Sequence, residues 1–258
     1  MEEPDNPEAR EAEPEAASPE PAPSPSNDER RRRLHTASGA FLGVFLVLHL
    51  LTNASALGGV EAYESIVGAM IRSKVWPLFE VIVLVPLAFH AVHGVRLLRR
   101  KSAPEGMVER YGDRRLWVAQ RITAAVVLVF VVVHVLSLRG QRLLFGLSTE
   151  AVHTTLVAHL SSSWLGVPWM ALLYLIGVGA ATFHFSNGLF AATAAWRPGM
   201  PAAARRRLRI GAVAVGLALF GVGTATVVGL ATGPRLFEWP ARAPSGAPCG
   251  PAGSNTSN

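Results

Sequence analysis

The sequence predicts an all-α membrane protein with five transmembrane helices, and three observations carry this prediction. Half of the 258 residues are hydrophobic and only 16% are charged, compared with roughly 25% charged residues in an ordinary soluble domain. The mean hydropathy is +0.31. The apolar residues fall in long blocks, and a spanning helix needs about 20 mostly apolar residues. A soluble helical bundle is disfavoured, because its helices would need polar faces that several blocks lack.

Five stretches are long and apolar enough to cross a bilayer. The second of them contains Glu80, two histidines and Arg96, so part of its surface must face protein rather than lipid. The fifth contains no charged residue at all and is the clearest of the set. The five predicted spans are Ser38–Leu57, Val75–Leu98, Trp117–Leu138, Trp164–Phe190 and Ile210–Ala231.

The helical domain, residues 30–231, is flanked by two segments of different composition. Residues 1–29 hold ten of the 18 acidic residues and one arginine, a net charge of −9. Since the whole chain is +6, the rest of it carries +15. An acidic leader rich in proline, glutamate and alanine cannot bury enough apolar surface to fold, so we expect disorder. It also lacks the basic start and short apolar core of a secretory signal. Residues 232–258 are expected to form a flexible external tail.

Lysine and arginine alternate cleanly between the two sides of the predicted bundle. They are concentrated before the first span, between the second and third, and between the fourth and fifth, while the other loops carry few. Because positive loops stay on the cytoplasmic side, the N-terminus is predicted to be cytoplasmic and the C-terminus external. The clusters are Arg30–Arg33; Arg99, Arg100, Lys101, Arg110, Arg114 and Arg115; and Arg197, Arg205, Arg206, Arg207 and Arg209.

Four histidines inside four different spans, His49, His90, His134 and His184, are the main functional signal. A polar ring in hydrocarbon is costly unless it is satisfied. From the helical rise, His90 and His184 lie about 9 Å from the cytoplasmic boundary. His134 and His49 lie about 8 Å and about 12 Å from the outer boundary. The histidines therefore form an outer and an inner pair, and two histidines on facing helices can clamp an iron porphyrin from both sides.

Other metal chemistries fit the composition less well. A zinc or proton pathway would normally use carboxylates too, and Glu80 is the only acidic residue inside any predicted span. A transporter that uses intramembrane histidines therefore remains the alternative from another class. A single cysteine, Cys249, excludes an intrachain disulfide framework and any Cys-rich zinc or iron–sulfur site.

The remaining histidines are less well placed to bind a metal. His93 follows His90 by three residues and shares its helix face, so it competes as a ligand but is expected to bond a neighbour instead. His35 lies at the membrane edge. His153 and His159 lie in the outer loop, where we expect solvated surface positions.

Four motifs in order resemble the dihaem cytochrome b subunit of succinate:menaquinone oxidoreductases and fumarate reductases. Together they cover about residues 30–231, and the fourth is the most specific. The motifs are RLHTASG at 33–39 followed by HLLTN at 49–53, PLAFHAVHGV at 86–95, QRIT at 120–123 with His134-Val135, and FHFSNGL at 183–189.

The resemblance implies one chain whose first four helices form a bundle around two stacked haems b. It pairs the first helix with the third and the second with the fourth. Carried over, His49 and His134 bind the outer haem iron, while His90 and His184 bind the inner one. This is also the pairing that depth suggests.

The resemblance also indicates residues that hold the inner haem propionates. His35, Thr36 and Trp117 occupy the matching positions, although some relatives have glutamine where this chain has His35. Arg121 and Arg197 are further candidates, because a propionate near the inner boundary needs a cation. The alternative for both arginines is that they anchor helix ends.

The function implied is that of a membrane anchor and electron conduit in a bacterial inner membrane. A flavoprotein subunit would hold the dicarboxylate site, an iron–sulfur subunit would relay electrons, and menaquinone would accept them. Glu80 lies where some relatives use a glutamate on the quinone route, and a buried carboxyl there could exchange protons with a quinone. A structural bond to a neighbouring helix is the alternative for Glu80. Another dihaem quinone-reactive cytochrome b is the nearest alternative function, and no nucleic-acid partner is expected.

Overall fold

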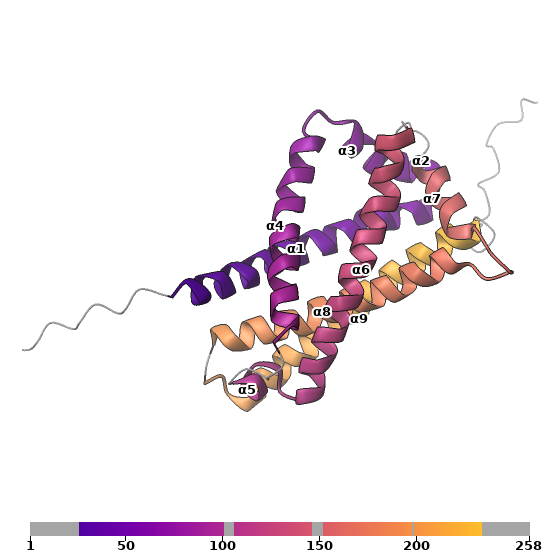
Figure 1. The fold of residues 1–258 in the computed structure, drawn as a ribbon. Coiled ribbons are helices and arrows are strands. Elements are labelled where there is room, and N and C mark those ends of the chain that lie inside the picture. Colours follow the sequence, from indigo (N-terminus) through magenta and orange to yellow (C-terminus); the bar gives the residue numbers. More distant parts are fainter. Residues whose placement is uncertain (1–25, 101–105, 146–151, 198, 234–258) are drawn as a thin grey trace, which may run out of the picture.

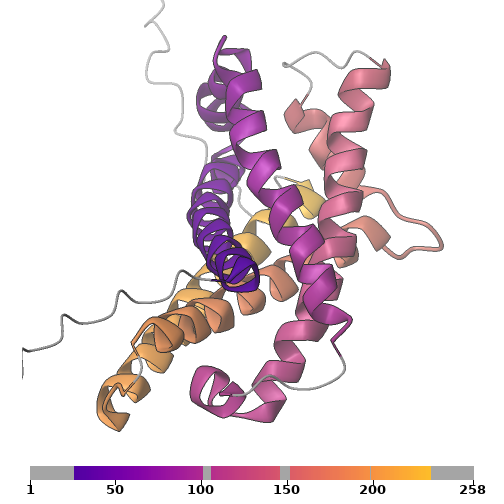
Figure 2. The same cartoon turned by 60° about the vertical axis from the view of Figure 1, so that its left-hand side comes forward.

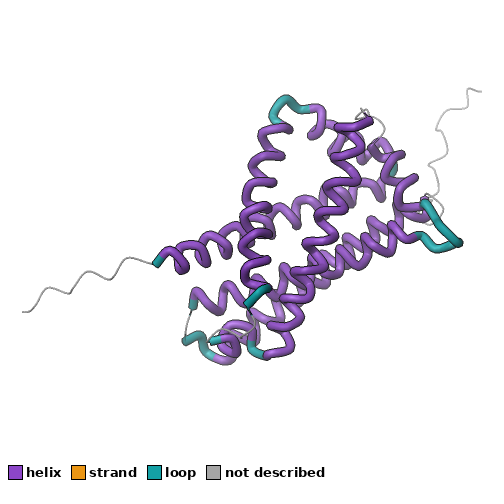
Figure 3. Tube along the Cα trace, viewed as in Figure 1, coloured by secondary structure: helices purple, strands orange, loops and turns teal. Residues whose placement is uncertain are grey.

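The computed structural model describes residues 26–100, 106–145, 152–197 and 199–233, and the named elements in these ranges are all helices. Short loops join them (Figure 3). Most of the leader and tail, residues 1–25 and 234–258, lies outside the described residues. The elements are α1 Asn27–Ala54, η1 Ser55–Gly58, α2 Val60–Tyr63, η2 Glu64–Gly68, α3 Ala69–Arg72, α4 Trp76–Leu98, α5 Met107–Tyr111, α6 Arg114–Phe145, α7 Val152–Ser161, α8 Trp169–Trp196 and α9 Ala202–Thr232.

Five of these helices, α1, α4, α6, α8 and α9, are long and apolar enough to cross a membrane, which confirms the five predicted spans. Four of them, α1, α6, α8 and α9, extend beyond the predicted limits. Helix α1 begins at Asn27 because the Ser26 hydroxyl accepts a hydrogen bond from the Glu29 amide and caps its first turn. Its 28 residues give a length of about 42 Å, more than the roughly 30 Å hydrocarbon layer. Helix α6 similarly continues to Phe145.

The short helices gather at the two ends of the long ones (Figure 1). Helices α2, α3 and α7 lie at one end, and α5 lies at the opposite end. We call these the α7 end and the α5 end. This division follows from the chain order, since consecutive long helices run in alternating directions.

Helices α1, α4, α6 and α8 form a four-membered ring (Figures 1 and 2). In this ring α1 neighbours α4, α4 neighbours α6, α6 neighbours α8, and α8 neighbours α1. Helix α9 stands outside the ring and packs along α8 and α1. Helices α1 and α6 therefore face each other diagonally, as do α4 and α8. The prediction that the first four spans form a bundle is confirmed.

Glycines bring the neighbouring helices close together, because a residue without a side chain lets two backbones approach. A Cβ atom on Gly177 of α8 would lie 2.3 Å from the Phe130 ring of α6. One on Gly43 of α1 would lie 2.2 Å from the Phe185 ring of α8. In both cases an aromatic ring covers the bare backbone of the neighbouring helix.

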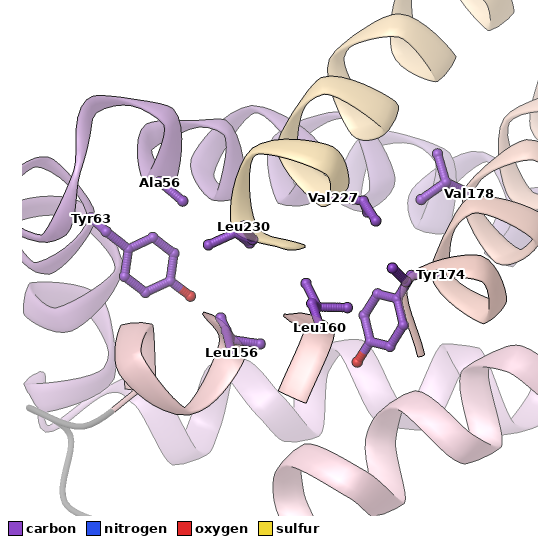
Figure 4. Close-up of a cluster of buried hydrophobic side chains, with 9 residues drawn as sticks. Ala56, Tyr63, Leu156, Leu160, Tyr174, Val178, Val227 and Leu230 are labelled. Atoms are coloured by element: carbon purple, nitrogen blue, oxygen red, sulfur yellow. The ribbon is translucent and has the colours of Figure 1, made fainter. Parts of the chain in front are cut away.

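A cluster of buried side chains closes the α7 end of the bundle (Figure 4). It joins α2, α7, α8 and α9 around Leu156 and Leu160. Tyr63 lies on one side of these leucines and Tyr174 on the other (Figure 4). Helix α7 is thus packed into the protein instead of lying free on its surface.

The close contact at Gly177 generates a stability prediction. We expect Gly177→Ala to destabilise the protein by about 1–3 kcal/mol, because the new methyl group overlaps Phe130 and forces α6 from α8. Thermal unfolding of the purified complex in detergent would measure the loss. Gly221→Ala is the matched control, since a Cβ there meets open space. Equal stability of the two variants would contradict the prediction.

Candidate functional site

The ring of helices brings the predicted outer pair of histidines together near the α7 end. His49 of α1 and His134 of α6 have ring centroids 5.9 Å apart, with the ring planes at 85°. Both side chains are partly buried. These are residues of two helices that face each other across the bundle diagonal, so the rings meet at its centre.

The second pair meets in the same manner nearer the α5 end. His90 of α4 and His184 of α8 have centroids 6.4 Å apart, with the planes at 88°. A metal–imidazole bond is about 2 Å long and the ring centre lies about 1 Å behind the nitrogen, so two imidazoles on one metal have centroids roughly 6 Å apart. Both separations match this value. Perpendicular ring planes are compatible with it, because each plane can contain the common ligand axis.

The two levels lie about half a bilayer apart. Ser38 contacts His90 and precedes His49 by 11 residues on α1, which separates the levels by about 16 Å. Tyr174 contacts His134 and precedes His184 by ten residues on α8, which gives about 15 Å. The two helices therefore agree on the spacing.

At the α5 end, both paired histidines have Nδ1 next to a backbone carbonyl of another helix. His90 Nδ1 lies 3.2 Å from the His35 carbonyl oxygen and 3.2 Å from Ser38 Oγ. His184 Nδ1 lies 3.3 Å from the Gln120 carbonyl oxygen and 3.1 Å from Gln120 Nε2. A carbonyl can only accept, so a proton on Nδ1 suits both contacts and would leave the lone pair of each Nε2 free. The Gln120 amide nitrogen itself donates to the His184 carbonyl oxygen at 3.0 Å.

At the α7 end the Nδ1 contacts come from side chains. His134 Nδ1 lies 3.1 Å from the Tyr174 hydroxyl of α8. His49 Nδ1 lies 3.4 Å from Asn53 Nδ2, whose amide also donates to the His49 carbonyl at 2.8 Å. The two levels thus orient their imidazoles by different means.

Two further histidines surround His90 and have nitrogens without hydrogen bonds. The His35 ring stacks on His90 at 4.0 Å and lies 5.0 Å from His93. His93 is only 8% exposed, yet neither of its ring nitrogens has a hydrogen-bond partner among the described residues, and the same holds for His35 Nδ1. The expected bond from His93 to a neighbour is therefore not formed. Buried nitrogens of this kind indicate a polar group that belongs between them.

Three other residues predicted to bind a propionate, Thr36, Trp117 and Arg121, contact other groups of the protein. Thr36 Oγ1 donates to the Arg32 carbonyl on its own helix at 3.1 Å. The Arg121 guanidinium lies over the Trp117 ring at 4.8 Å. It also donates to the carbonyl oxygens of Leu97 at 2.9 Å and of Leu98 at the end of α4, and to that of Arg100, just beyond it, at 3.0 Å. Arg121 thus anchors a helix end, where a cation also complements the helix dipole.

Arg197 and Glu80 lie at opposite ends of the bundle. Helix α8 continues to Trp196, so Arg197 is 13 residues, or about 20 Å along the axis, beyond His184. This distance does not favour a contact between Arg197 and a group bound at His184. Glu80 lies near the start of α4 at the α7 end, where its carboxylate accepts a hydrogen bond from Trp76 Nε1 at 2.8 Å.

The expectation of a solvated position is wrong for His153, which is buried. It is only partly right for His159, which is half-buried. His153 is 9% exposed and lies 5.6 Å from the Tyr63 ring. His159 has a buried Nε2 and lies 6.3 Å from the Tyr174 ring. The cause is α7 itself, which folds as a helix and turns both residues toward the bundle.

Burial changes the acid–base behaviour at the α7 end. Burial lowers the pKa of His153 below its ordinary value of 6.5, and the nearby Glu64 carboxylate opposes the shift. Burial, assisted by Glu64, raises the pKa of Tyr63 to about 12. Glu64 also pairs with Arg72, with 3.3 Å between Oε2 and the guanidinium nitrogen. His153 and Tyr63 are thus both held in their neutral forms near neutral pH.

Sequence reasoning missed the residues that contact Nδ1 of the four paired histidines. Ser38, Asn53 and Gln120 lie in the quoted motifs without an assigned role, and Tyr174 lies outside them. The sequence does carry a signal for Tyr174, because a tyrosine inside an apolar span needs a hydrogen-bond partner for its hydroxyl. Which partner it finds depends on helix packing.

Comparison with known proteins agrees with this architecture. Residues 32–103 match the model of the succinate dehydrogenase/fumarate reductase transmembrane subunit. Over 167 residues the chain is 34% identical to the succinate dehydrogenase cytochrome b558 subunit of Bacillus subtilis (strain 168). The aligned part covers 64% of this chain and 78% of that relative.

The lowered pKa of His153 generates a pH prediction. The folded protein resists protonation of His153, so the packing of α7 is fully stable above pH 6.5 and weakens as the pH falls from there toward the lowered pKa. Hydrogen exchange of the α7 amides, corrected for intrinsic rates, should therefore be faster at about pH 5.5 than at about pH 7.5.

His153→Phe is the control for this experiment, because it fills the same space without a titrating group. We expect the difference between the two pH values to shrink in this variant. A pH effect of equal size in both proteins would show that another group is responsible.

Proposed function

The chain belongs to the family of transmembrane subunits of succinate dehydrogenases and fumarate reductases, and from this premise we propose that it conducts electrons through two haems b to menaquinone. It would anchor an iron–sulfur subunit and a flavoprotein subunit to the membrane. The dicarboxylate site would lie on the flavoprotein partner. The similarity to a cytochrome b558 subunit supports the haem assignment.

The observation that carries the proposal is the pairing of four intramembrane histidines across the two diagonals of the bundle. Their centroid separations of 5.9 and 6.4 Å suit two imidazoles on one iron. We assign His49 and His134 to one haem iron, and His90 and His184 to the other. Each bound haem would supply an iron that accepts and releases one electron. At His90 and His184, donation from Nδ1 to a backbone carbonyl would keep Nε2 available.

The His90 level also offers groups for the haem carboxylates. The unpartnered nitrogens of His35 and His93 can donate hydrogen bonds to a propionate beside His90. Arg121 still has guanidinium N–H groups beyond those used on α4, and Trp117 has an indole N–H. We therefore propose His35, His93, Trp117 and Arg121 for this role. Thr36 remains a weaker candidate, and Arg197 is not retained.

Charge distribution supports the orientation and the docking side. The α5 end carries exposed arginines, including Arg110, Arg114 and Arg115, and it would be cytoplasmic by the positive-inside rule. Arg205 donates to the Val108 carbonyl at 3.1 Å, and Arg209 donates to the Tyr111 carbonyl, so α9 holds α5 in position. A basic surface on this side would steer a soluble electron-donating partner toward the His90 level.

The α7 end would be external and would exchange protons with menaquinone. Glu80 is partly buried near the end of α4 and is oriented by Trp76. We propose that its carboxyl transfers protons between the external medium and the quinone. The hydrogen bond from Trp76 would hold the carboxyl in place.

Single replacement of the paired histidines tests the haem assignment. We predict that alanine at His49, His90, His134 or His184 removes one of two haems, because the pair of imidazoles that would hold that haem is then incomplete. The complete complex would be purified and its haem counted from the reduced-minus-oxidised absorption spectrum. His93→Ala is the comparison on the same helix: it removes a proposed propionate contact but no proposed iron ligand, so it should keep both haems.

Retention of both haems in His90→Ala, with loss in His93→Ala, would reverse the assignment on α4. A wild-type complex without low-spin haem b would overturn the electron-transfer function. Reduction of both haems by succinate would separate the proposed complex from other dihaem quinone cytochromes.

A further inference from the structure

Tyr174 occupies an unusual position for a membrane tyrosine. It is 6% exposed, and its hydroxyl lies 3.1 Å from His134 Nδ1. The Phe130 ring packs against both partners, 5.3 Å from Tyr174 and 5.6 Å from His134. His159 of α7 lies on Tyr174 at 6.3 Å. The phenol is thus held at the edge of the buried cluster, against the imidazole (Figure 4).

The other paired histidines do not depend on a single side chain of another helix in this way. His90 and His184 have cross-helix backbone carbonyls beside Nδ1, and no side-chain substitution removes these. The Asn53 amide near His49 comes from the next turn of the same helix. For His134, the described group that lies beside Nδ1 is the hydroxyl of Tyr174, a side chain of another helix.

We propose that Tyr174 is a positioning residue that fixes the His134 ring and lowers the reduction potential of the haem it shares with His49. This inference rests on the proposed function. An imidazole that binds iron through Nε2 carries its proton on Nδ1, and here that N–H donates to the phenolic oxygen. An acceptor at Nδ1 raises the basicity of the imidazole. A more basic ligand favours ferric iron over ferrous iron.

The fold keeps this hydrogen bond out of competition with water. Leu160, which is 1% exposed, packs beside Tyr174 in the buried cluster. Because the bond lies in a dry region, its effect on the ligand is larger than it would be at a wet surface. Helix α8 also carries His184 ten residues further on, so a single rigid helix positions residues at both levels.

The test is Tyr174→Phe in the complete complex with its partner subunits, followed by a redox titration of the haem absorbance. We expect both haems to remain, one of the two midpoint potentials to rise, and the other to stay unchanged. The low-spin electron paramagnetic resonance signal of the same haem should shift. The His90→Ala variant, which retains the His49–His134 haem, identifies which potential belongs to it.

Tyr63→Phe is the matched control, because it removes a hydroxyl from the same buried cluster without touching a paired histidine. Neither potential should change in it. An unchanged Tyr174→Phe, an equal shift of both potentials, or the same shift in Tyr63→Phe would overturn the inference. A wild-type complex without two low-spin haems would instead overturn the proposed function.

A second variant decides the case in which Tyr174→Phe loses haem. Tyr174→Gln offers an amide oxygen that can still accept from Nδ1. Retention of the His49–His134 haem in this variant, with its loss in Tyr174→Phe, supports the positioning role. Loss of the haem in both variants would show that the hydroxyl contact is not what matters.

Discussion

An imidazole nitrogen in hydrocarbon must have a partner, and this requirement connects every helix of the ring to another. His90 of α4 contacts the α1 backbone, His184 of α8 contacts the α6 backbone, and His134 of α6 contacts Tyr174 of α8. These are neighbouring helices. The rings of each diagonal pair meet at the centre of the bundle, so the histidines link neighbouring helices through Nδ1 and would leave Nε2 for the proposed metal.

Packing supports the same division of roles between neighbours and diagonals. Aromatic rings cover glycines where α1 meets α8 and where α6 meets α8, and this lets those backbones approach closely. The diagonal helices instead meet through large imidazoles at two heights. Close neighbours and separated diagonals are what a bundle needs in order to enclose two flat ligands.

Sequence alone predicts the five long helices and the pairing of His49 with His134 and of His90 with His184. Apolar length and helical rise fix these features without knowledge of packing. The surroundings of the pairs depend on tertiary structure and could not be predicted in the same way. The carbonyl contacts of Arg121 require the end of α4 to lie beside α6. The burial of His153 requires α7 to fold back onto α2. Neither position has a sequence signal of its own.

The spacing of the two histidine levels has an electrical consequence. At about 16 Å, it spans roughly half of the 30 Å hydrocarbon layer. In the proposed orientation, an electron that passes outward between the levels moves from the negative to the positive side of an energised membrane. Moving one charge across the full layer is worth about 2.3 kcal/mol for each 100 mV of membrane potential. Half a crossing is therefore worth about 1.2 kcal/mol per electron for each 100 mV. The energised membrane would therefore assist electron flow toward the quinone and oppose the reverse direction.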